Sequence, residues 1–176
     1  PDEYWLLLSA LVPYKGLDIA IEAFNQSGRP LHVVGTGAER ARLEAKASGN
    51  IRFFGWLSDE EVHSQYCQAQ GLVFPGEEDF GITPLEANAC GRPVVAFRRG
   101  GVLESQQEGT TACFFDQQTA ESLNGAIDRA SRQSWDEDVI RTHALSFDRK
   151  RFKKQMEAAI TRCHEAWQRW LADEDV

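Results

Sequence analysis

The chain lacks the features that mark several large classes of protein. None of its apolar runs approaches the roughly 18 residues that cross a bilayer, and no signal-peptide pattern opens it. The net charge is −8, and an acidic surface disfavours general nucleic-acid binding. We therefore expect a cytoplasmic protein that binds no nucleic acid and touches a membrane only peripherally, at its inner face.

Cysteine is scarce and widely spaced. The four cysteines, Cys67, Cys90, Cys113 and Cys163, form neither a CxxC motif nor a Cys/His spacing typical of metal sites. Such cysteines are typical of buried free thiols in a reducing compartment. No Asp-x-Asp stands in a loop suited to a metal either, so the sequence predicts no metal and no cofactor.

The composition that is present predicts one globular domain. Apolar residues make up 42% of the chain and charged residues 26%, as in ordinary globular proteins. A chain of 176 residues is long enough for a sizeable core. It opens with Pro1 rather than Met, from which we expect that it has been cut from something longer. Residues 1–176 are treated as a single domain.

Short apolar runs alternate with helical patterns along the chain. The runs expected as strands are residues 4–8, 31–34, 51–54, 72–74, 93–97 and 112–115. Amphipathic or capped segments separate them, for example residues 16–25 and 38–47, and helices follow from Thr119 onward. This alternation predicts a Rossmann-like three-layer α/β/α fold with a parallel sheet of about six strands. In such sheets, ligands bind at the carboxyl ends of the strands.

Residues 148–171 are predicted to form a long C-terminal helix. Apolar side chains recur there at three- and four-residue intervals, namely Phe152, Met156, Ile160, Cys163, Trp167 and Trp170. We expect this helix to dock on the same domain or on a missing N-terminal domain. A basic cluster at residues 149–154 keeps open a third alternative, contact with a membrane surface.

Two carboxylates, Glu78 and Glu86, lie eight positions apart between an expected strand and a helix that starts near Pro84. One interpretation is structural: Thr83 and Glu86 form a capping box and Glu78 is a solvated loop acid. The other is functional, since the carboxylates and the free N–H groups between them suit an anionic ligand that carries hydroxyl groups. The segment alone leaves both open.

Residues 35–40 begin like the dinucleotide fingerprint G-x-G-x-x-G. Arg40 stands in place of the third glycine, and the motif follows the second expected strand rather than the first. Both departures weigh against NAD binding. We expect Gly35 and Gly37 to permit a tight turn and the close approach of a ligand.

Several loops of special composition follow strand-like runs. They hold Lys15, Gly35, Gly37, Glu78, Gly81 and Gly100. Because the carboxyl ends of parallel strands meet at one edge of the sheet, we expect these residues to lie near one another. This convergence favours a functional interpretation of the two carboxylates over a structural one.

Three motifs, in order, resemble those of the C-terminal, nucleotide-sugar-binding domain of retaining glycosyltransferases of the GT-B fold, family 4 or group 1. They are residues 11–16, residues 34–37, and an E-x7-E signature from Glu78 to Glu86 that continues through residues 91–95. The resemblance covers nearly the whole chain. The wording around Glu78 is most similar to the mannosyltransferase branch.

The resemblance implies roles for these residues. Glu86 is similar to the acid that binds the ribose hydroxyls of the donor, and Glu78 to the acid near the transferred sugar. Lys15 is similar to the cation that neutralises the diphosphate, so Glu78 and Lys15 are the expected catalytic residues. The other expected donor-binding positions are Gly81, Ile82 and Thr83 at the sugar and distal phosphate, Gly35 and Gly37 in the second loop, and Phe54, Gly55 and Trp56 at the base.

One position departs from the family pattern. The family usually has an arginine five residues before the lysine, where this chain has Ala10. Losing one charge-assisted contact typically costs about 1.5–3 kcal/mol. Either Arg98 or Arg99 compensates, or the donor binds weakly, or the mature protein is not an efficient transferase.

The resemblance implies the donor-binding half of an enzyme that moves a sugar from a nucleotide-diphosphate sugar to an acceptor hydroxyl, with GDP-mannose favoured as donor. A GT-B enzyme needs a facing N-terminal acceptor domain, so this chain alone is expected to be inactive. The alternative is a non-catalytic nucleotide-sugar-binding or regulatory module, which Ala10 favours. A GT-B-fold epimerase is a third class, against which the E-x7-E wording argues.

Overall fold

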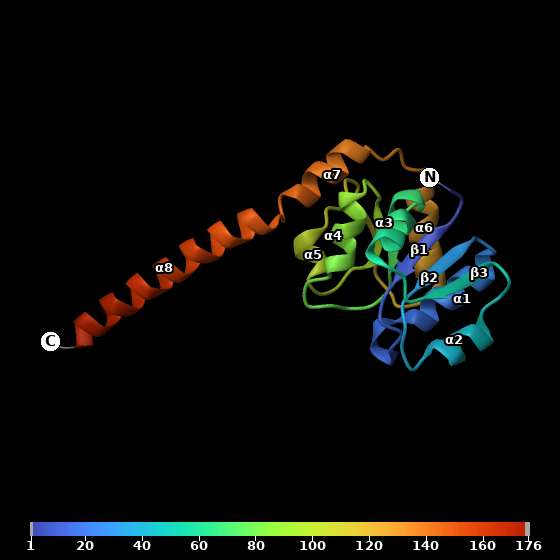
Figure 1. The fold of residues 1–176 in the computed structure, drawn as a ribbon, viewed down its shortest axis with the longest axis horizontal. Helices are drawn as coiled ribbons and strands as arrows, with labels where there is room; N and C mark the ends of the chain where they lie inside the picture. The colour runs from blue at the N-terminus through green and yellow to red at the C-terminus, as the bar shows by residue number, and fades with distance from the viewer. Residues whose placement is uncertain (1, 175–176) are drawn as a thin grey trace. The chain divides into compact units, whose positions relative to one another are not determined.

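The computed structural model describes residues 2–174; Pro1, on which the expectation of a longer chain depends, lies outside them. The chain divides into two units, residues 1–144 and residues 145–176. The first unit contains the sheet and the cavity, and the second contains the terminal helix. Figure 1 gives the order of the elements along the chain.

Six parallel strands form the sheet of the first unit. They are β1 Trp5–Leu8, β2 Leu31–Val34, β3 Ile51–Gly55, β4 Leu72–Phe74, β5 Val94–Phe97 and β6 Ala112–Phe115. Their order is β3-β2-β1-β4-β5-β6, and all five neighbouring pairs are parallel. This is the Rossmann order, in which the chain reverses its direction of winding between β1 and β4. The predicted fold class is confirmed.

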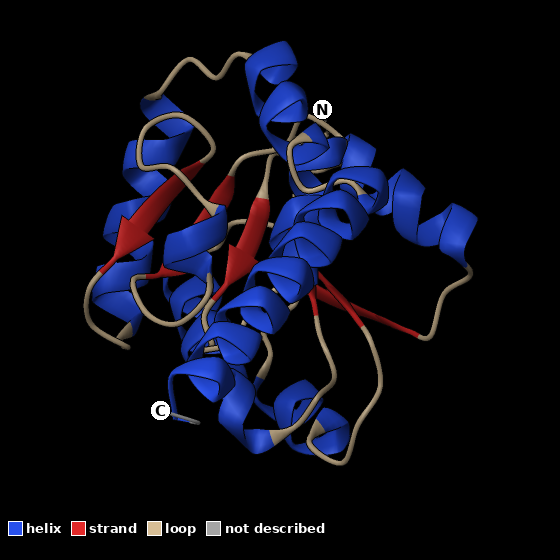
Figure 2. Ribbon diagram, turned by 90° about the vertical axis from the view of Figure 1, so that its left-hand side faces the viewer, coloured by secondary structure: helices blue, strands red, loops and turns tan. Residues whose placement is uncertain are grey.

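Helices cover both faces of the sheet in Figure 2, and the core divides accordingly. In β1, Trp5 and Leu7 belong to one buried cluster and Leu6 to the other, because successive side chains of a strand point to opposite faces. The first cluster includes Phe24 and Ile127 from helices on one face. A strand buried on both faces explains why the runs read as continuously apolar.

The helices of the first unit follow the strands in the expected alternation. They are η1 Pro13–Lys15, a 3-10 turn, α1 Leu17–Ser27, α2 Arg40–Lys46, α3 Asp59–Gln68, α4 Ile82–Ala89, α5 Val102–Ser105, α6 Ala120–Arg132 and α7 Glu137–Leu145, whose last residue falls in the second unit. The predicted helices at residues 16–25 and 38–47 are α1 and α2, with ends shifted by one or two residues. A capping box opens α3, because Ser58 and Glu61 each bond the other's backbone N–H.

The second unit consists mainly of α8, Arg149–Glu174. Its apolar positions fall on the predicted three- and four-residue spacing, and the large ones are exposed: Phe152, Met156, Ile160, Trp167, Trp170 and Leu171. The expected docking of residues 148–171 stays a prediction. Across the described residues, none of the helices combines the length and the apolarity that crossing a membrane requires.

Candidate functional site

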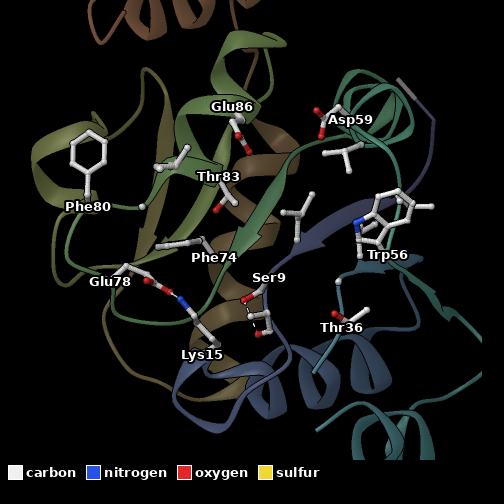
Figure 3. Close-up of a pocket in the computed structure, with 18 of the residues that line it drawn as sticks. Ser9, Lys15, Thr36, Trp56, Asp59, Phe74, Glu78, Phe80, Thr83 and Glu86 are labelled. Atoms are coloured by element: carbon white, nitrogen blue, oxygen red, sulfur yellow. Dashed lines mark hydrogen bonds and ion pairs between the residues drawn. The ribbon is translucent and has the colours of Figure 1, made fainter. Parts of the chain in front are cut away.

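A cavity of about 740 Å³ opens at the carboxyl ends of β1, β2, β3 and β4. Its size falls in the range of small-molecule sites, and its place is the switch point where such sheets bind ligands. The residues that line it are Leu8, Ser9, Ala10, Lys15, Val34, Gly35, Thr36, Gly55, Trp56, Leu57, Asp59, Val62, Phe74, Glu78, Asp79, Phe80, Gly81, Ile82, Thr83 and Glu86. The expected convergence of loops therefore produces one hollow (Figure 3).

Lys15 and Glu78 form an ion pair at the edge of this cavity. Lys15 ends the turn η1 after β1, and Glu78 lies in the loop after β4. The two loops touch through Gly16: with φ of 68°, a Cβ there would lie 2.8 Å from the carbonyl oxygen of Pro75. Partial burial lowers the pKa of Lys15. Close backbone contact thus places the predicted catalytic pair together.

The loop that carries Glu78 is supported by the glycines that follow β5. The N–H of Gly101 donates to the carbonyl oxygen of Glu78 at 2.8 Å. A Cβ on Gly101 would lie 2.1 Å from the carbonyl oxygen of Asp79. The loop after β5 therefore holds the backbone that carries Glu78, although Gly100 and Gly101 do not themselves line the cavity.

Glu86 has a partner that the sequence did not indicate. The phenol of Tyr66, in α3, donates to a carboxylate oxygen of Glu86, in α4, at 2.8 Å. Tyr66 is only 3% exposed, and burial together with the charge of Glu86 raises the pKa of its phenol. The phenol therefore stays protonated as a donor, and the second carboxylate oxygen is left for other contacts.

The capping box that was one of the two interpretations of Thr83 and Glu86 is absent at the start of α4. α4 begins at Ile82, with Gly81 as its N-cap at φ of 78° and with no side-chain capping bond. The first N–H groups of a helix have no partner within it, and they carry the positive end of the helix dipole. Gly81, Ile82 and Thr83 all line the cavity, so this helix end is available to an anion.

Gly35 and Gly37, in the loop after β2, allow close contact between backbone segments more than they shape the cavity. A Cβ on Gly35 would lie 1.9 Å from the carbonyl oxygen of Ser9, and one on Gly37 would lie 2.2 Å from that of Leu11. Gly35 also lines the cavity, whereas Gly37 is not among its lining residues. Both glycines allow the loop after β1 to approach closely, and the close approach of a ligand stays a prediction.

The predicted base-binding positions separate in the structure. Gly55 and Trp56 line the cavity, and the indole of Trp56 is 78% exposed. Phe54 is not among the lining residues; its ring lies 4.7 Å from the ring of His32 and packs against the core. Of the three predicted base-binding positions, Trp56 is thus the one that brings an aromatic side chain to the cavity.

Neither arginine proposed to replace the missing cation lies at the cavity. Arg98 bonds Asp116 at 2.7 Å and Glu108 at 2.8 Å, and Arg99 approaches Glu77 at 4.0 Å. Ala10 does line the cavity. Among the described lining residues, Lys15 is therefore the one lysine or arginine, beside the acids Asp59, Glu78, Asp79 and Glu86.

Comparison with known families decides the relationship. The family described as "Glycosyl transferases group 1" matches residues 1–145. The chain belongs to the group 1 glycosyltransferases. This match covers all six strands and every residue that lines the cavity.

Curated group 1 relatives are about a third identical to this chain. The O-antigen chain mannosyltransferase C of Escherichia coli is 30% identical over 165 residues, which cover 89% of this chain and 43% of that protein. A GDP-mannose-dependent phosphatidylinositol monomannoside mannosyltransferase of Mycolicibacterium smegmatis is 32% identical over 138 residues, covering 68% and 36%. The chain therefore spans less than half the length of these relatives.

A solved structure shares the fold of this group 1 glycosyltransferase chain. The lipopolysaccharide outer core galactosyltransferase WaaB, in its apo form, superposes with a TM-score of 0.81 at 18% identity, over 90% of this chain and 49% of that one. At this identity the match concerns the fold, which is that of one half of a GT-B enzyme.

Some residues of the cavity were missed from sequence. Asp59 lines it because the Ser58 capping box starts α3 beside Trp56, and the Ser-x-x-Glu pattern of residues 58–61 could have indicated this position. Ser9 and Thr36 line it from loops that the sequence had already singled out. Tyr66 carried no comparable signal, because its bond to Glu86 joins residues 20 positions apart, which no local pattern encodes.

Proposed function

We propose that this chain is the donor-binding half of a retaining glycosyltransferase, which moves a sugar from a nucleotide-diphosphate sugar to an acceptor hydroxyl. The observation that carries the proposal is the cavity at the switch point, with the Lys15–Glu78 pair at one side and Glu86 at the other. Membership of the group 1 family supports the same reaction class.

The cavity offers a different group to each part of such a donor. Trp56 presents an exposed ring for the base, and the free oxygen of Glu86 accepts from the ribose hydroxyls. Lys15 and the first N–H groups of α4 receive the diphosphate. Glu78 then faces the transferred sugar from the loop after β4.

In the proposed reaction, the bond between the anomeric carbon and the diphosphate oxygen breaks, and the acceptor oxygen bonds to that carbon as its proton passes to the departing diphosphate. Negative charge grows on the leaving diphosphate. Lys15 and the amino end of α4 are fixed in place before the reaction and oppose that charge, which is the kind of stabilisation that lowers a barrier. This scheme uses no metal in the donor cavity.

GDP-mannose is the proposed donor. The Mycolicibacterium relative is named as GDP-mannose-dependent, and the Escherichia coli relative is named as a mannosyltransferase. The structural neighbour is a galactosyltransferase, so the shared fold accepts other sugars. Titration of the chain with GDP, UDP and ADP would compare the bases directly, and we expect GDP to bind most tightly.

Titration of a Glu86→Ala variant tests the site itself. Removal of the carboxylate deletes a charge-assisted contact worth about 1.5–3 kcal/mol, so the affinity for nucleoside diphosphate should fall about 10- to 150-fold. Glu44→Ala is the matched control, because Glu44 lies in α2 and pairs with Arg40 outside the cavity. Unchanged binding by Glu86→Ala would refute the ribose assignment.

The chain alone should bind nucleotide without turnover. The chain spans less than half the length of these curated relatives, and we assign the acceptor site to a facing N-terminal domain. Mixing the chain with donor and acceptor sugars should therefore yield no transferred product. Sustained transfer by these 176 residues would overturn the two-domain assignment while leaving the donor site intact.

A non-catalytic binding module is the second candidate, favoured by Ala10. With Arg98 and Arg99 engaged by acids away from the cavity, a single cation is left to oppose the diphosphate charge. Turnover by the longer protein separates the two candidates: an enzyme consumes donor in the presence of acceptor, whereas a module binds the nucleotide and leaves the donor intact.

A further inference from the structure

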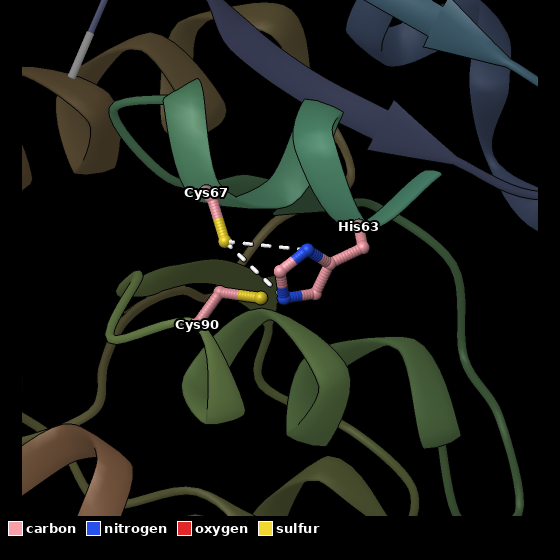
Figure 4. Close-up of side chains that lie close together, drawn as sticks. All are labelled: His63, Cys67 and Cys90. Atoms are coloured by element: carbon pink, nitrogen blue, oxygen red, sulfur yellow. Dashed lines mark hydrogen bonds between the residues drawn. The ribbon is translucent and has the colours of Figure 1, made fainter. Parts of the chain in front are cut away.

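Three side chains with metal-binding atoms meet between α3 and α4, away from the cavity. His63 and Cys67 lie one helical turn apart in α3, and Cys90 follows the last residue of α4. Their ligand atoms all lie within 4.8 Å of one another. Figure 4 shows the imidazole and both sulfur atoms turned toward a common point. None of the three lines the donor cavity.

The spacing of these atoms suits a tetrahedral ion. Zn²⁺ binds thiolate sulfur at about 2.3 Å and imidazole nitrogen at about 2.0–2.1 Å, so a tetrahedral edge between them measures about 3.6 Å. The Sγ of Cys67 lies 3.5 Å from Nε2 of His63 and 3.9 Å from Nδ1. The two ligands of α3 therefore already have the separation that such an ion requires.

Cys90 is the buried member of the cluster, with 7% exposure, whereas His63 is exposed and Cys67 is half-buried. A metal ion between the two sulfur atoms would remove both protons, because the thiolate is the form that binds metal.

We propose that His63, Cys67 and Cys90 form a zinc site that joins α3 to the end of α4. Zn²⁺ displaces the two thiol protons and takes two sulfur ligands and one nitrogen, and water completes the tetrahedron on the exposed side of His63. Thiolate and imidazole are the ligands that zinc prefers over hard-cation sites.

The proposed zinc site lies outside the cavity, but its ligands are close in sequence to Glu86 and to the partner of Glu86. Tyr66, which donates to Glu86, directly precedes Cys67 in α3, and Cys90 lies four residues after Glu86. The phenol–carboxylate bond and the metal would therefore hold the same two helices together at two points. The sequence missed this site because only His63 and Cys67 share a local spacing, and Cys90 is brought to them by the fold.

Co²⁺ is the spectroscopic probe of the site, and Zn²⁺ competition measures affinity. We expect the chain, kept reduced by a phosphine, to bind one equivalent of Co²⁺ with a thiolate-to-metal absorption band that Zn²⁺ abolishes. Binding should release two protons and weaken as the pH falls. Cys67→Ser and His63→Ala should each weaken Zn²⁺ binding at least about 100-fold, since even outer-shell changes cost 10- to 100-fold.

Matched controls lie in α8, where Cys163 is exposed. Cys163→Ser and His164→Ala should keep the band and the affinity. Because His63 is exposed and Cys67 half-buried, their variants keep the test valid even where Cys90→Ser fails to fold; the melting curve without metal checks this. An unchanged band in the His63→Ala, Cys67→Ser double variant would overturn the proposal. A Cys67–Cys90 disulfide that persists in reductant, with no metal uptake, would overturn it equally.

Discussion

Two of the four acids that line the cavity, Glu78 and Glu86, belong to the same motif and are held by opposite kinds of partner. Glu78 lies in a loop and is paired with the ammonium group of Lys15. Glu86 lies in a helix and accepts a bond from the neutral phenol of Tyr66. We call these the Glu78 side, formed by Lys15 and Glu78, and the Glu86 side, formed by Tyr66 and Glu86.

The difference concerns what each side must give up when a ligand binds. On the Glu86 side, one carboxylate oxygen is still open, so the proposed ribose would add bonds without breaking any. On the Glu78 side, Lys15 is already paired, and the proposed diphosphate would have to share or displace its partner. The Glu86 side is therefore preorganised for a ligand. On the Glu78 side, a ligand has to compete with the ion pair that is already there.

Loss of Lys15 should have the largest effect. Lys15→Ala removes the one lysine or arginine among the described lining residues and leaves Glu78 unpaired beside the phosphates. A charge-assisted contact of about 1.5–3 kcal/mol predicts an affinity for GDP that is about 10- to 150-fold lower. Isothermal titration at fixed ionic strength measures the change.

Lys46→Ala is the control for that experiment, because Lys46 lies in α2 and pairs with Asp18 outside the cavity. Adding Glu78→Gln to Lys15→Ala should recover part of the lost affinity by removing the unpaired charge. Equal binding by the Lys15→Ala variant and the unaltered chain would mean that the helix end alone holds the diphosphate.

A cation restored at position 10 should strengthen the Glu78 side. Ala10→Arg places a guanidinium group at the cavity wall. Unlike the ammonium group of Lys15, it is not already paired with a carboxylate there. We expect GDP to bind about tenfold more tightly, the low end of a charge-assisted contact, because position 10 is exposed. The gain should shrink as salt is added.

Ala10→Gln adds similar bulk without charge and is the control for Ala10→Arg. Its affinity should stay near that of the unaltered chain. A gain that is the same for both substitutions would assign the effect to contact area instead of charge, and would remove the missing arginine as a reason to favour a non-catalytic module.

Neutralising Glu78 should separate binding from chemistry. Glu78→Gln releases Lys15 to the phosphates, and a partly exposed ion pair is worth at most about 1 kcal/mol, so GDP should bind up to about fivefold more tightly. Transfer by the proposed two-domain enzyme should fall at the same time. Glu77→Gln is the control, since Glu77 does not line the cavity; weaker GDP binding by Glu78→Gln would assign Glu78 to the nucleotide.

The fold was predictable because its strands are buried on both faces. Apolar runs such as Leu72–Phe74 and Ala112–Phe115 cannot alternate with polar residues when helices cover both sides, and glycines mark where β2 and β3 stop. The helix ends were less predictable. α4 starts at Ile82 because Gly81 adopts a left-handed conformation, whereas Thr83 and Pro84 carry the stronger local start signal.

The cavity was predictable in outline and not in its pairings. Loop position in a parallel sheet brings Lys15, Glu78 and Glu86 to one edge whatever their neighbours are. Which of them bond one another depends on contacts across 63 positions for Lys15 and Glu78 and 20 for Tyr66 and Glu86. The same limit explains why Gly37 and Phe54 were assigned to the ligand, although their contacts are with a neighbouring loop and with the core.

Removal of the Tyr66 hydroxyl should produce the smallest effect and test the preorganisation of the Glu86 side directly. Tyr66→Phe leaves the ring in the core and removes the bond to Glu86. Because Glu86 is exposed, its carboxylate is then free to turn toward water. A neutral hydrogen bond contributes about 0.5–1.5 kcal/mol, and water replaces part of it, so GDP affinity should fall about two- to threefold. Tyr4→Phe is the control, since that phenol donates to the carbonyl oxygen of Gln65 instead. If Tyr66→Phe weakened GDP binding as much as Glu86→Ala, the carboxylate would need its phenol partner to act at all, and the two sides would differ less than their partners indicate.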